Sequence, residues 1–231
     1  MCRSNTGRHL AEFWMVEPEM AFSGMDECCT LAQNVVQNAL QGALDTCLDD
    51  LTFFQKTQEE NLLNRLETTV KMPTFPRMTY TEAIAVLEKV AKTASFTYPI
   101  SWGQDLHTEH ERYLAEEYVN GPLFVTDYPA SIKPFYMKSN DDAPPRETVA
   151  CFDLLVPRVG ELIGGSVRED RPDRLHLPDS SLEWYADLRR FGTVPHAGWG
   201  LGFERLVLYA TGLKNIRDVI PMPRTPGSCP A

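Results

Sequence analysis

Two acidic residues and an arginine fall within one short segment, and together they could bind a metal ion beside a small polar ligand. The segment has apolar runs on either side of residues 157–160, a pattern typical of an antiparallel hairpin. If the turn centres on Pro157, Asp153 and Glu161 face each other across the two strands. Facing carboxylates destabilise a sheet unless a cation lies between them, and Mg²⁺ prefers such oxygen ligands. The pattern therefore predicts a Mg²⁺ site at this pair.

Arg168 is the third charged group of the same segment. It follows Glu161 by seven residues, so in a straight strand the two side chains would point to opposite faces. A bulge at Gly164 and Gly165 would bring Arg168 onto the metal-binding face, where its planar donors could bind one small ligand. The alternative interpretation is a surface hairpin whose charges face water.

A second candidate site precedes a helix near the C-terminus. Gly198, Gly200 and Gly202 occupy every second position, which would clear one face of a strand for a flat ligand. Arg205 then falls in the first turn of the helix, where backbone donors and the helix dipole favour phosphate. Equally, Glu204 or Arg205 could be an ordinary exposed helical charge. A glycine-rich turn alone is a weak signal for either interpretation.

The segment from His9 to Glu17 alternates as a strand would. One predicted face carries His9, Ala11, Phe13, Met15 and Glu17. Runs at 124–128, 134–138 and 149–156 also predict strands.

Helical spacing covers residues 30–53, and capping boxes predict two further helices. One box joins Thr79 to Glu82 and opens a helix through Ala94, and the other joins Thr108 to Glu111. A last helix is expected over residues 203–211, ending at Gly212. Strands and helices do not alternate regularly, which favours an α+β fold with a mostly antiparallel sheet flanked by helices.

Composition limits the classes of function. The 231 residues carry a formal net charge of −10, which argues against a general nucleic-acid coat because such a protein needs a basic face. No apolar stretch approaches membrane-spanning length, so no membrane partner is expected. The six cysteines form no CxxC pair, and we interpret them as reduced thiols.

Several long segments resemble one family of enzymes. Residues 8–22, RHLAEFWMVEPEMAF, resemble the second half of motif 2 of class II aminoacyl-tRNA synthetases, and residues 196–207, HAGWGLGFERLV, resemble their motif 3. Residues 154–170 and 124–142 resemble the asparaginyl branch of that family. The likeness covers nearly the whole chain, and it implies that residues 1–231 form the C-terminal part of one class II catalytic domain.

The resemblance implies an ATP site with Mg²⁺. It would place Arg8 and His9 on the phosphates, Phe13 on the adenine ring, and Arg205 on the adenine or the terminal phosphate. Gly198, Gly200 and Gly202 would form the floor beneath adenosine, and Asp153 and Glu161 would hold the Mg²⁺. Of these, Arg8 and Arg205 would be catalytic.

For the amino acid, the resemblance implies asparagine as the substrate. Glu17 would receive its ammonium group, and Arg168, the third expected catalytic residue, would orient its carboxamide oxygen. The implied reaction is ATP-dependent activation of asparagine and its transfer to tRNA(Asn), so asparagine and tRNA(Asn) are the expected partners.

Other expectations follow from what the resemblance does not cover. The family's anticodon-binding OB-fold, its motif 1, which builds a homodimer, and the first strand of motif 2 have no counterpart in the chain. We therefore expect it to be weakly active or inactive alone. Two alternatives stay open: a related asparagine synthetase, and a non-catalytic nucleotide- or tRNA-binding fragment. The expected location is intracellular, in the mitochondrial matrix or the cytoplasm.

Overall fold

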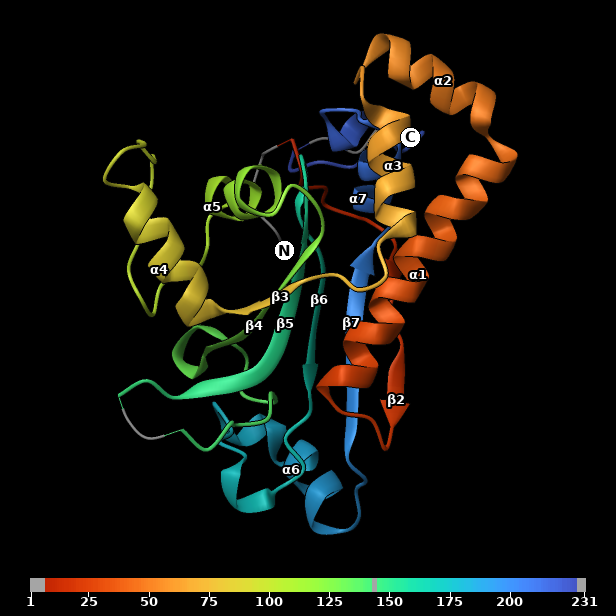
Figure 1. The fold of residues 1–231 in the computed structure, drawn as a ribbon. Helices are drawn as coiled ribbons and strands as arrows, with labels where there is room; N and C mark the ends of the chain where they lie inside the picture. The colour runs from red at the N-terminus through yellow and green to blue at the C-terminus, as the bar shows by residue number, and fades with distance from the viewer. Residues whose placement is uncertain (1–6, 143–144, 228–231) are drawn as a thin grey trace.

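A seven-stranded sheet, antiparallel except between β3 and β4, forms the centre of the computed structural model (Figure 1). The structure describes residues 7–142 and 145–227. Along the sheet the order is β1-β7-β6-β5-β4-β3, and β2 also pairs with β7. The strands are β1 Met15–Val16, β2 Glu19–Ala21, β3 Arg77–Thr79, β4 Leu123–Pro129, β5 Thr148–Val156, β6 Gly160–Val167 and β7 His196–Gly202. The expected α+β class is confirmed.

Helices lie against both faces of this sheet (Figure 1). The α-helices are α1 Met25–Thr46, α2 Leu48–Thr57, α3 Leu62–Lys71, α4 Tyr80–Val90, α5 Thr108–Tyr113, α6 Glu183–Arg190 and α7 Phe203–Thr211. Shorter helical turns are η1 Leu114–Tyr118, η2 Ala130–Ile132, η3 Pro172–Arg174, η4 Ser180–Leu182 and η5 Ile216–Asp218. None of the helices within the described ranges is both long enough and apolar enough to cross a lipid bilayer.

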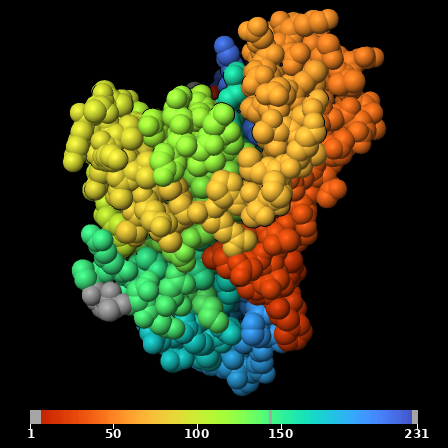
Figure 2. Space-filling view, in the orientation of Figure 1, coloured from red at the N-terminus to blue at the C-terminus, as the bar shows by residue number. Residues whose placement is uncertain are grey.

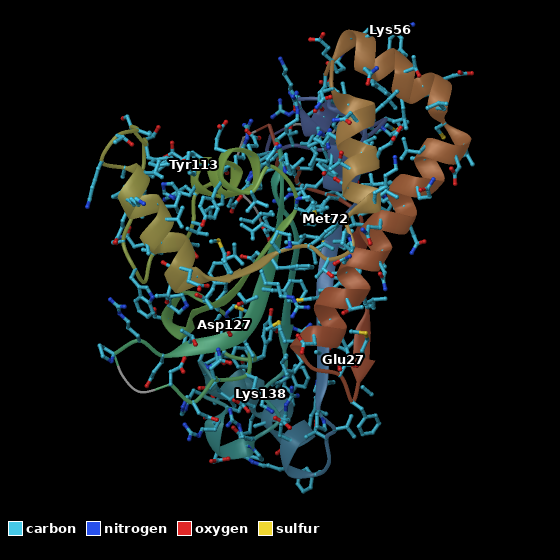
Figure 3. The ribbon with its side chains drawn as sticks, in the orientation of Figure 1. Glu27, Lys56, Met72, Tyr113, Asp127 and Lys138 are labelled. Atoms are coloured by element: carbon cyan, nitrogen blue, oxygen red, sulfur yellow. The ribbon has the colours of Figure 1, made fainter. Side chains whose placement is uncertain are left out.

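Two hydrophobic cores hold these layers together. Phe152, Leu154 and Val156 of β5 pack with α1, α3 and α7, whereas Cys151 and Leu155 pack with α4 and α5. Figure 2 shows the segments α1–α3 and α4–α5 as two masses that are parted at the top of the view and adjoin below. Side chains from both fill the space against the sheet, with Met72 after α3 on one side and Tyr113 of α5 on the other (Figure 3).

Strand alternation decides where the acidic side chain of β5 points. Asp153 lies between Leu154 and Phe152, which face α1, so its own side chain shares the opposite face with Cys151 and Leu155. Towards β6 and β7 this face is hollowed by two pockets. The sheet therefore carries the candidate site on the α4–α5 face, beside those helices.

Predictions based on helical periodicity are mostly confirmed, with shifted ends. The helix expected over residues 30–53 begins earlier, at Met25, and is interrupted at Cys47. The next helix, α2, starts at Leu48 and runs in a new direction (Figure 1). Thr79 caps α4 as expected and Glu82 completes the box, but the helix ends at Val90. The helix over residues 203–211 is confirmed, and Gly212 ends it with φ +70°.

Two strand predictions are wrong in extent. In the segment from His9 to Glu17 only Met15–Val16 is a strand, and pairing resumes at β2 after Pro18, which lacks a backbone donor. The run 134–138 is not a strand either: a turn in which the Met137 amide donates to the Pro134 carbonyl leaves only one bridge, between Met137 and Arg168.

The second capping-box prediction is also wrong. Helix α5 does begin at Thr108, but its N-cap is His107, and the His110 ring accepts a hydrogen bond from the His107 amide. Glu111 does not reach back to the helix start. Its side chain is buried instead against Arg8 and the first residues of β6.

Gly160 begins β6 in a conformation that favours glycine. Its φ is +84°, and a Cβ there would overlap the Glu111 carboxylate. We expect Gly160→Ala to lower the free energy of unfolding by at least about 1–2 kcal/mol. Gly42 lies inside α1 with open space around it, so Gly42→Ala should raise it by about 0.5–1 kcal/mol. Urea denaturation of both variants measures this, and equal stability of the two would contradict the local geometry.

Cysteine reactivity gives a second check of the packing. Burial raises the pKa of Cys28 to about 11 and the pKa values of Cys29 and Cys151 to about 12, whereas Cys47 is exposed. Since the thiolate is the nucleophile, iodoacetamide at pH 8 should alkylate Cys47 in the native protein and spare the other three. Peptide mass spectrometry reads this out, and rapid alkylation of Cys151 would be inconsistent with the fold. Cys2 and Cys229 lie outside the described residues.

Candidate functional site

Two adjoining pockets lie on the α4–α5 face of the sheet. We call the first, of about 250 Å³, the Arg205 pocket and the second, of about 510 Å³, the Arg168 pocket. The Arg205 pocket is lined among others by Arg8, His9, Phe13, Gly202 and Arg205, and the Arg168 pocket by Glu17, Glu19, Lys133, Asp153 and Arg168. Met15, Glu161 and Gly200 line both, so these three residues form the boundary between them.

The hairpin brings its two carboxylates together by a different register from the one expected. Asp153 pairs with Gly164, and Glu161 pairs with Leu155, so the two acids are not directly opposite. An extra residue, Leu162, shifts Glu161 onto the face of Asp153. A Cβ on Gly164 would lie 3.0 Å from Glu161 Oε1 and 3.4 Å from Asp153 Oδ1. Both side chains therefore lie over the same glycine.

Arg168 shares that face because of the same irregularity. The expected bulge at Gly164 and Gly165 is wrong, since both pair in regular register with β5 and β7. Gly165 instead allows close packing, because a Cβ there would lie 2.6 Å from Trp199 and 2.7 Å from Phe152. The bulge at Leu162 places Glu161 and Arg168 on the same face of the sheet, and Arg168 lines the Arg168 pocket.

Glu19 holds the Arg168 guanidinium in a two-point ion pair. Nε and Nη2 of Arg168 donate to the two Glu19 oxygens, each at 2.9 Å, and Nη1 donates to Ser166 Oγ at 2.6 Å. The hydrogen bond from Arg168 lowers the pKa of Glu19. Our sequence reasoning missed Glu19, although its alternation with Glu17 across Pro18 is a signal that could have placed both on one side.

Two cations neutralise the paired carboxylates. Lys133 Nζ lies 2.9 Å from Asp153 Oδ2, and Arg205 Nη1 lies 3.1 Å from Glu161 Oε2. Burial raises the pKa of Asp153 to about 6, with Lys133 lowering it and Glu161 raising it. Burial also tends to raise the pKa of Glu161, but Arg205, Lys133 and Arg8 together lower it. Lys133 is a second residue that sequence reasoning did not assign.

Arg205 lies where the sequence predicts, in the first turn of α7. Its Nη1 also donates to the Glu161 carbonyl at 2.8 Å. Neighbouring Glu204 is buried, and both of its oxygens accept the Trp14 amide at 3.1 Å, which ties α7 to the chain entering β1. The alternative of exposed helical charges is therefore wrong for both residues.

Arg8 and His9 enter the Arg205 pocket from a loop. Arg8 Nη1 donates to Glu111 Oε2 at 2.7 Å. Partial burial lowers the pKa of His9, and the positive charges of Arg205 and Arg8 lower it further. The His9 imidazole is therefore neutral at pH 7 and can serve as a hydrogen-bonding group. Phe13 is about half exposed at the pocket rim.

The three alternating glycines leave space for different neighbouring side chains. A Cβ on Gly198 would overlap Glu19, and a Cβ on Gly200 would lie 2.6 Å from the Met15 methyl group. Gly202 faces the Arg205 side chain, with its nearest atom at 3.5 Å. Gly200 and Gly202 therefore line the Arg205 pocket as expected, whereas Gly198 lies beneath the ion pair of Glu19 and lines neither pocket.

The donor set fits Mg²⁺ bound jointly with a polyphosphate. Within the described ranges, no cluster of three or more His, Cys, Asp or Glu side chains could hold a metal by protein ligands alone. Mg²⁺, however, commonly takes one or two carboxylates and completes its shell with water and phosphate oxygens. Asp153 and Glu161 are partly exposed, lie side by side and have Lys133 and Arg205 next to them, so they match that requirement.

Comparison with known proteins identifies the family of the chain. Residues 3–226 match the family model described as tRNA synthetases class II (D, K and N). The asparagine–tRNA ligases of Clostridium beijerinckii and Thermosynechococcus vestitus are 51% and 52% identical to the chain over 232 residues each. Each alignment covers 97% of this chain and 49% of the relative, so the chain spans about half the length of these curated relatives.

Solved structures of asparaginyl-tRNA synthetases have the same fold as this chain. Asparaginyl-tRNA synthetase from Pyrococcus horikoshii, complexed with asparaginyl-adenylate, superposes with a TM-score of 0.84 at 39% identity, over 97% of this chain and 50% of that one. The enzyme from Entamoeba histolytica, in complex with the same adenylate, superposes with a TM-score of 0.81 at 28% identity, over 100% of this chain and 52% of that one. Together with the matched family model, these similarities show that the chain belongs to the class II tRNA synthetases of the D, K and N group.

Proposed function

We propose that this chain binds ATP in the Arg205 pocket and asparagine in the Arg168 pocket, and joins them as asparaginyl-adenylate for transfer to tRNA(Asn). The observation that carries the proposal is the shared boundary of the two pockets at Met15, Glu161 and Gly200. A molecule with a nucleotide at one end and an amino acid at the other can span such a pair. Asparaginyl-adenylate, with which the Pyrococcus horikoshii enzyme is complexed, is a molecule of this kind.

At the amino-acid end, the pair of Arg168 and Glu19 suits a carboxamide. An amide side chain offers one acceptor and one donor, and this ion pair offers a guanidinium donor and a carboxylate acceptor side by side. Aspartate would place a second carboxylate against Glu19, which is unfavourable between like charges. Glu17, in the same pocket, is the proposed partner of the ammonium group.

At the nucleotide end, the charges suit a triphosphate. Arg8 and Arg205 supply positive charge, and Phe13 with Gly200 and Gly202 supplies apolar surface for an adenine ring. Asp153 and Glu161 would hold Mg²⁺, which when bound neutralises phosphate charge. Gly198 supports Glu19 and forms no part of the floor beneath adenosine.

The proposed chemistry needs positioning more than proton transfer. A carboxylate oxygen of asparagine attacks the α-phosphorus of ATP, the bond to pyrophosphate breaks, and no proton moves. Arg8 and Arg205 stabilise the charge that develops on the phosphate oxygens. In the second step the terminal ribose hydroxyl of tRNA(Asn) attacks the adenylate carbonyl, an ester bond forms, and the bond from that carbonyl carbon to the phosphate oxygen breaks. AMP leaves, and the hydroxyl proton is released to the phosphate or to water.

Asparagine-dependent exchange of pyrophosphate into ATP tests the proposal. We expect residues 1–231 to exchange with asparagine and not with aspartate, more slowly than relatives of full length because β1, in the described part of the sheet, pairs on one side only. A parallel incubation with aspartate, ammonia and ATP distinguishes the alternative of an asparagine synthetase, which would release free asparagine. If exchange is absent and calorimetry detects neither asparagine nor an adenylate analogue, the binding assignment is wrong.

A further inference from the structure

Glu111 of α5 connects two parts of the candidate site that lie far apart in sequence. Its Oε2 accepts a hydrogen bond from Arg8 Nη1 at 2.7 Å and another from the backbone amide of Glu161 at 3.2 Å. The first contact spans 103 residues and the second spans 50. One carboxylate oxygen therefore binds the arginine of the nucleotide end and the backbone of a proposed Mg²⁺ ligand.

This contact is built into the fold. The Glu111 side chain is 9% exposed and the Arg8 side chain 18% exposed, so water screens their attraction less than on an open surface. Gly160 leaves room for the carboxylate, since a Cβ at that position would overlap Glu111 Oε2 and lie 3.0 Å from Arg8 Nη1. The Val159 carbonyl accepts a further, longer bond from Arg8 at 3.5 Å. The turn of the hairpin is thus shaped around the ion pair.

We infer that Glu111 is a positioning residue for ATP: it fixes Arg8 against the start of β6, so that the phosphate-binding arginine and Glu161 are held at a set separation. This inference rests on the proposed function. Glu111 lines neither pocket, so it acts through these two groups and has no direct contact with asparagine.

Replacement of Glu111 should weaken the binding of ATP and not that of asparagine. Charge-assisted hydrogen bonds are about twice as strong as neutral ones, so Glu111→Gln weakens the hold on Arg8 even where the amide oxygen takes the same place. Glu111→Ala removes both bonds and leaves Arg8 without this partner. Replacing a residue that hydrogen-bonds to a ligand-binding group and orients it typically lowers ligand affinity by about 10- to 100-fold. Glu161, which also lines the Arg168 pocket, donates its backbone amide to Glu111. The residues proposed to bind asparagine, Glu17, Glu19 and Arg168, have no hydrogen bond to Glu111, so affinity for asparagine should be kept.

Glu109 provides a matched control on the same helix. Its carboxylate also accepts two backbone bonds, from the Thr97 and Tyr98 amides at 3.0 and 2.7 Å, but it has no contact with either pocket. By calorimetry with Mg²⁺·ATP and separately with asparagine, we expect ATP affinity to fall about tenfold in Glu111→Gln and towards 100-fold in Glu111→Ala. Asparagine affinity should stay within twofold of wild type, and Glu109→Gln should change neither.

Equal losses for ATP and asparagine in the Glu111 variants, or ATP affinity unchanged in both, would overturn the inference. A second readout does not depend on nucleotide binding: phenylglyoxal modification of Arg8, followed by mass spectrometry, should be faster in Glu111→Gln than in wild type or Glu109→Gln. If the wild type binds no ATP, the proposed function fails, while the modification rate of Arg8 still decides whether Glu111 holds that arginine. An unchanged rate would then contradict the positioning role.

Discussion

An Arg168→Met variant is expected to bind a non-hydrolysable asparaginyl-adenylate analogue about 30- to 150-fold more weakly than wild type. The substitution removes the guanidinium donors proposed for the carboxamide oxygen and leaves the Glu19 carboxylate without its two-point partner. A lost hydrogen bond to a charged group costs about 2–3 kcal/mol, which corresponds to this range. Isothermal titration calorimetry measures the change.

Two controls separate this effect from a general loss of structure. Arg190 forms ion pairs with Glu183 and Asp187 on the outer surface of α6, so Arg190→Met should leave binding unchanged. Affinity for ATP alone should also be preserved in Arg168→Met, because Arg168 does not line the Arg205 pocket. If the analogue binds Arg168→Met as tightly as wild type, the amino acid does not lie in the Arg168 pocket.

Combined replacement of Asp153 by Asn and Glu161 by Gln should abolish the Mg²⁺ dependence of ATP binding. The two side chains supply the carboxylates over Gly164, and the amides of the variant are neutral and bind Mg²⁺ poorly. Replacing a residue that only orients a metal ligand already lowers metal affinity by about 10- to 100-fold. Loss of both direct ligands should therefore lower Mg²⁺ affinity at least about 100-fold. ATP titrations with Mg²⁺ and with EDTA measure this: the two curves should differ for wild type and coincide for the variant.

Asp170→Asn is the control for this experiment. Asp170 also pairs with a lysine, Lys138 at 2.7 Å, but it lines neither pocket. It should retain the wild-type response to Mg²⁺. A double variant that still binds ATP more tightly with Mg²⁺ than with EDTA would place the metal elsewhere.

Local sequence pattern was sufficient for the elements whose determinants are local. Helical spacing and a glycine stop identified α7, and the Thr79 box identified the start of α4, because caps and periodicity depend on residues within one or two turns. Apolar runs around residues 157–160 identified the hairpin. The charged hairpin and the glycine-rich turn were found from pattern, and the resemblance added the residues from Arg8 to Glu17. All of these site residues except Gly198 line at least one of the two pockets.

The register between β5 and β6 could not be predicted from local sequence pattern. A hairpin register depends on turn conformation, and here Arg158 and Gly160 both adopt positive φ, at 68° and 84°. The resulting bulge at Leu162 changes which residues share a face of the sheet. It brings Glu161 close to Asp153 on one face, although the two residues are not directly opposite each other. A count of residues from the turn centre could not reveal this.

Contacts between distant segments were also invisible in the sequence. Glu111 fits a capping box by spacing, yet its partner Arg8 is 103 residues away. Glu19 lies 149 residues from Arg168, and Lys133 lies 20 residues from Asp153, directly before a segment that the sequence wrongly predicts as a strand. Homodimer formation and the cellular compartment stay predictions from the resemblance.

The central claim is that one ligand spans both pockets. A crystal structure of residues 1–231 grown with a non-hydrolysable asparaginyl-adenylate analogue and Mg²⁺ tests it most directly. We expect the adenine beside Phe13 and Arg205, the carboxamide between Arg168 and Glu19, and the group that replaces the phosphate over Glu161 and Gly200. Density for the analogue outside these two pockets, or with its amino-acid end towards Arg205, would contradict it.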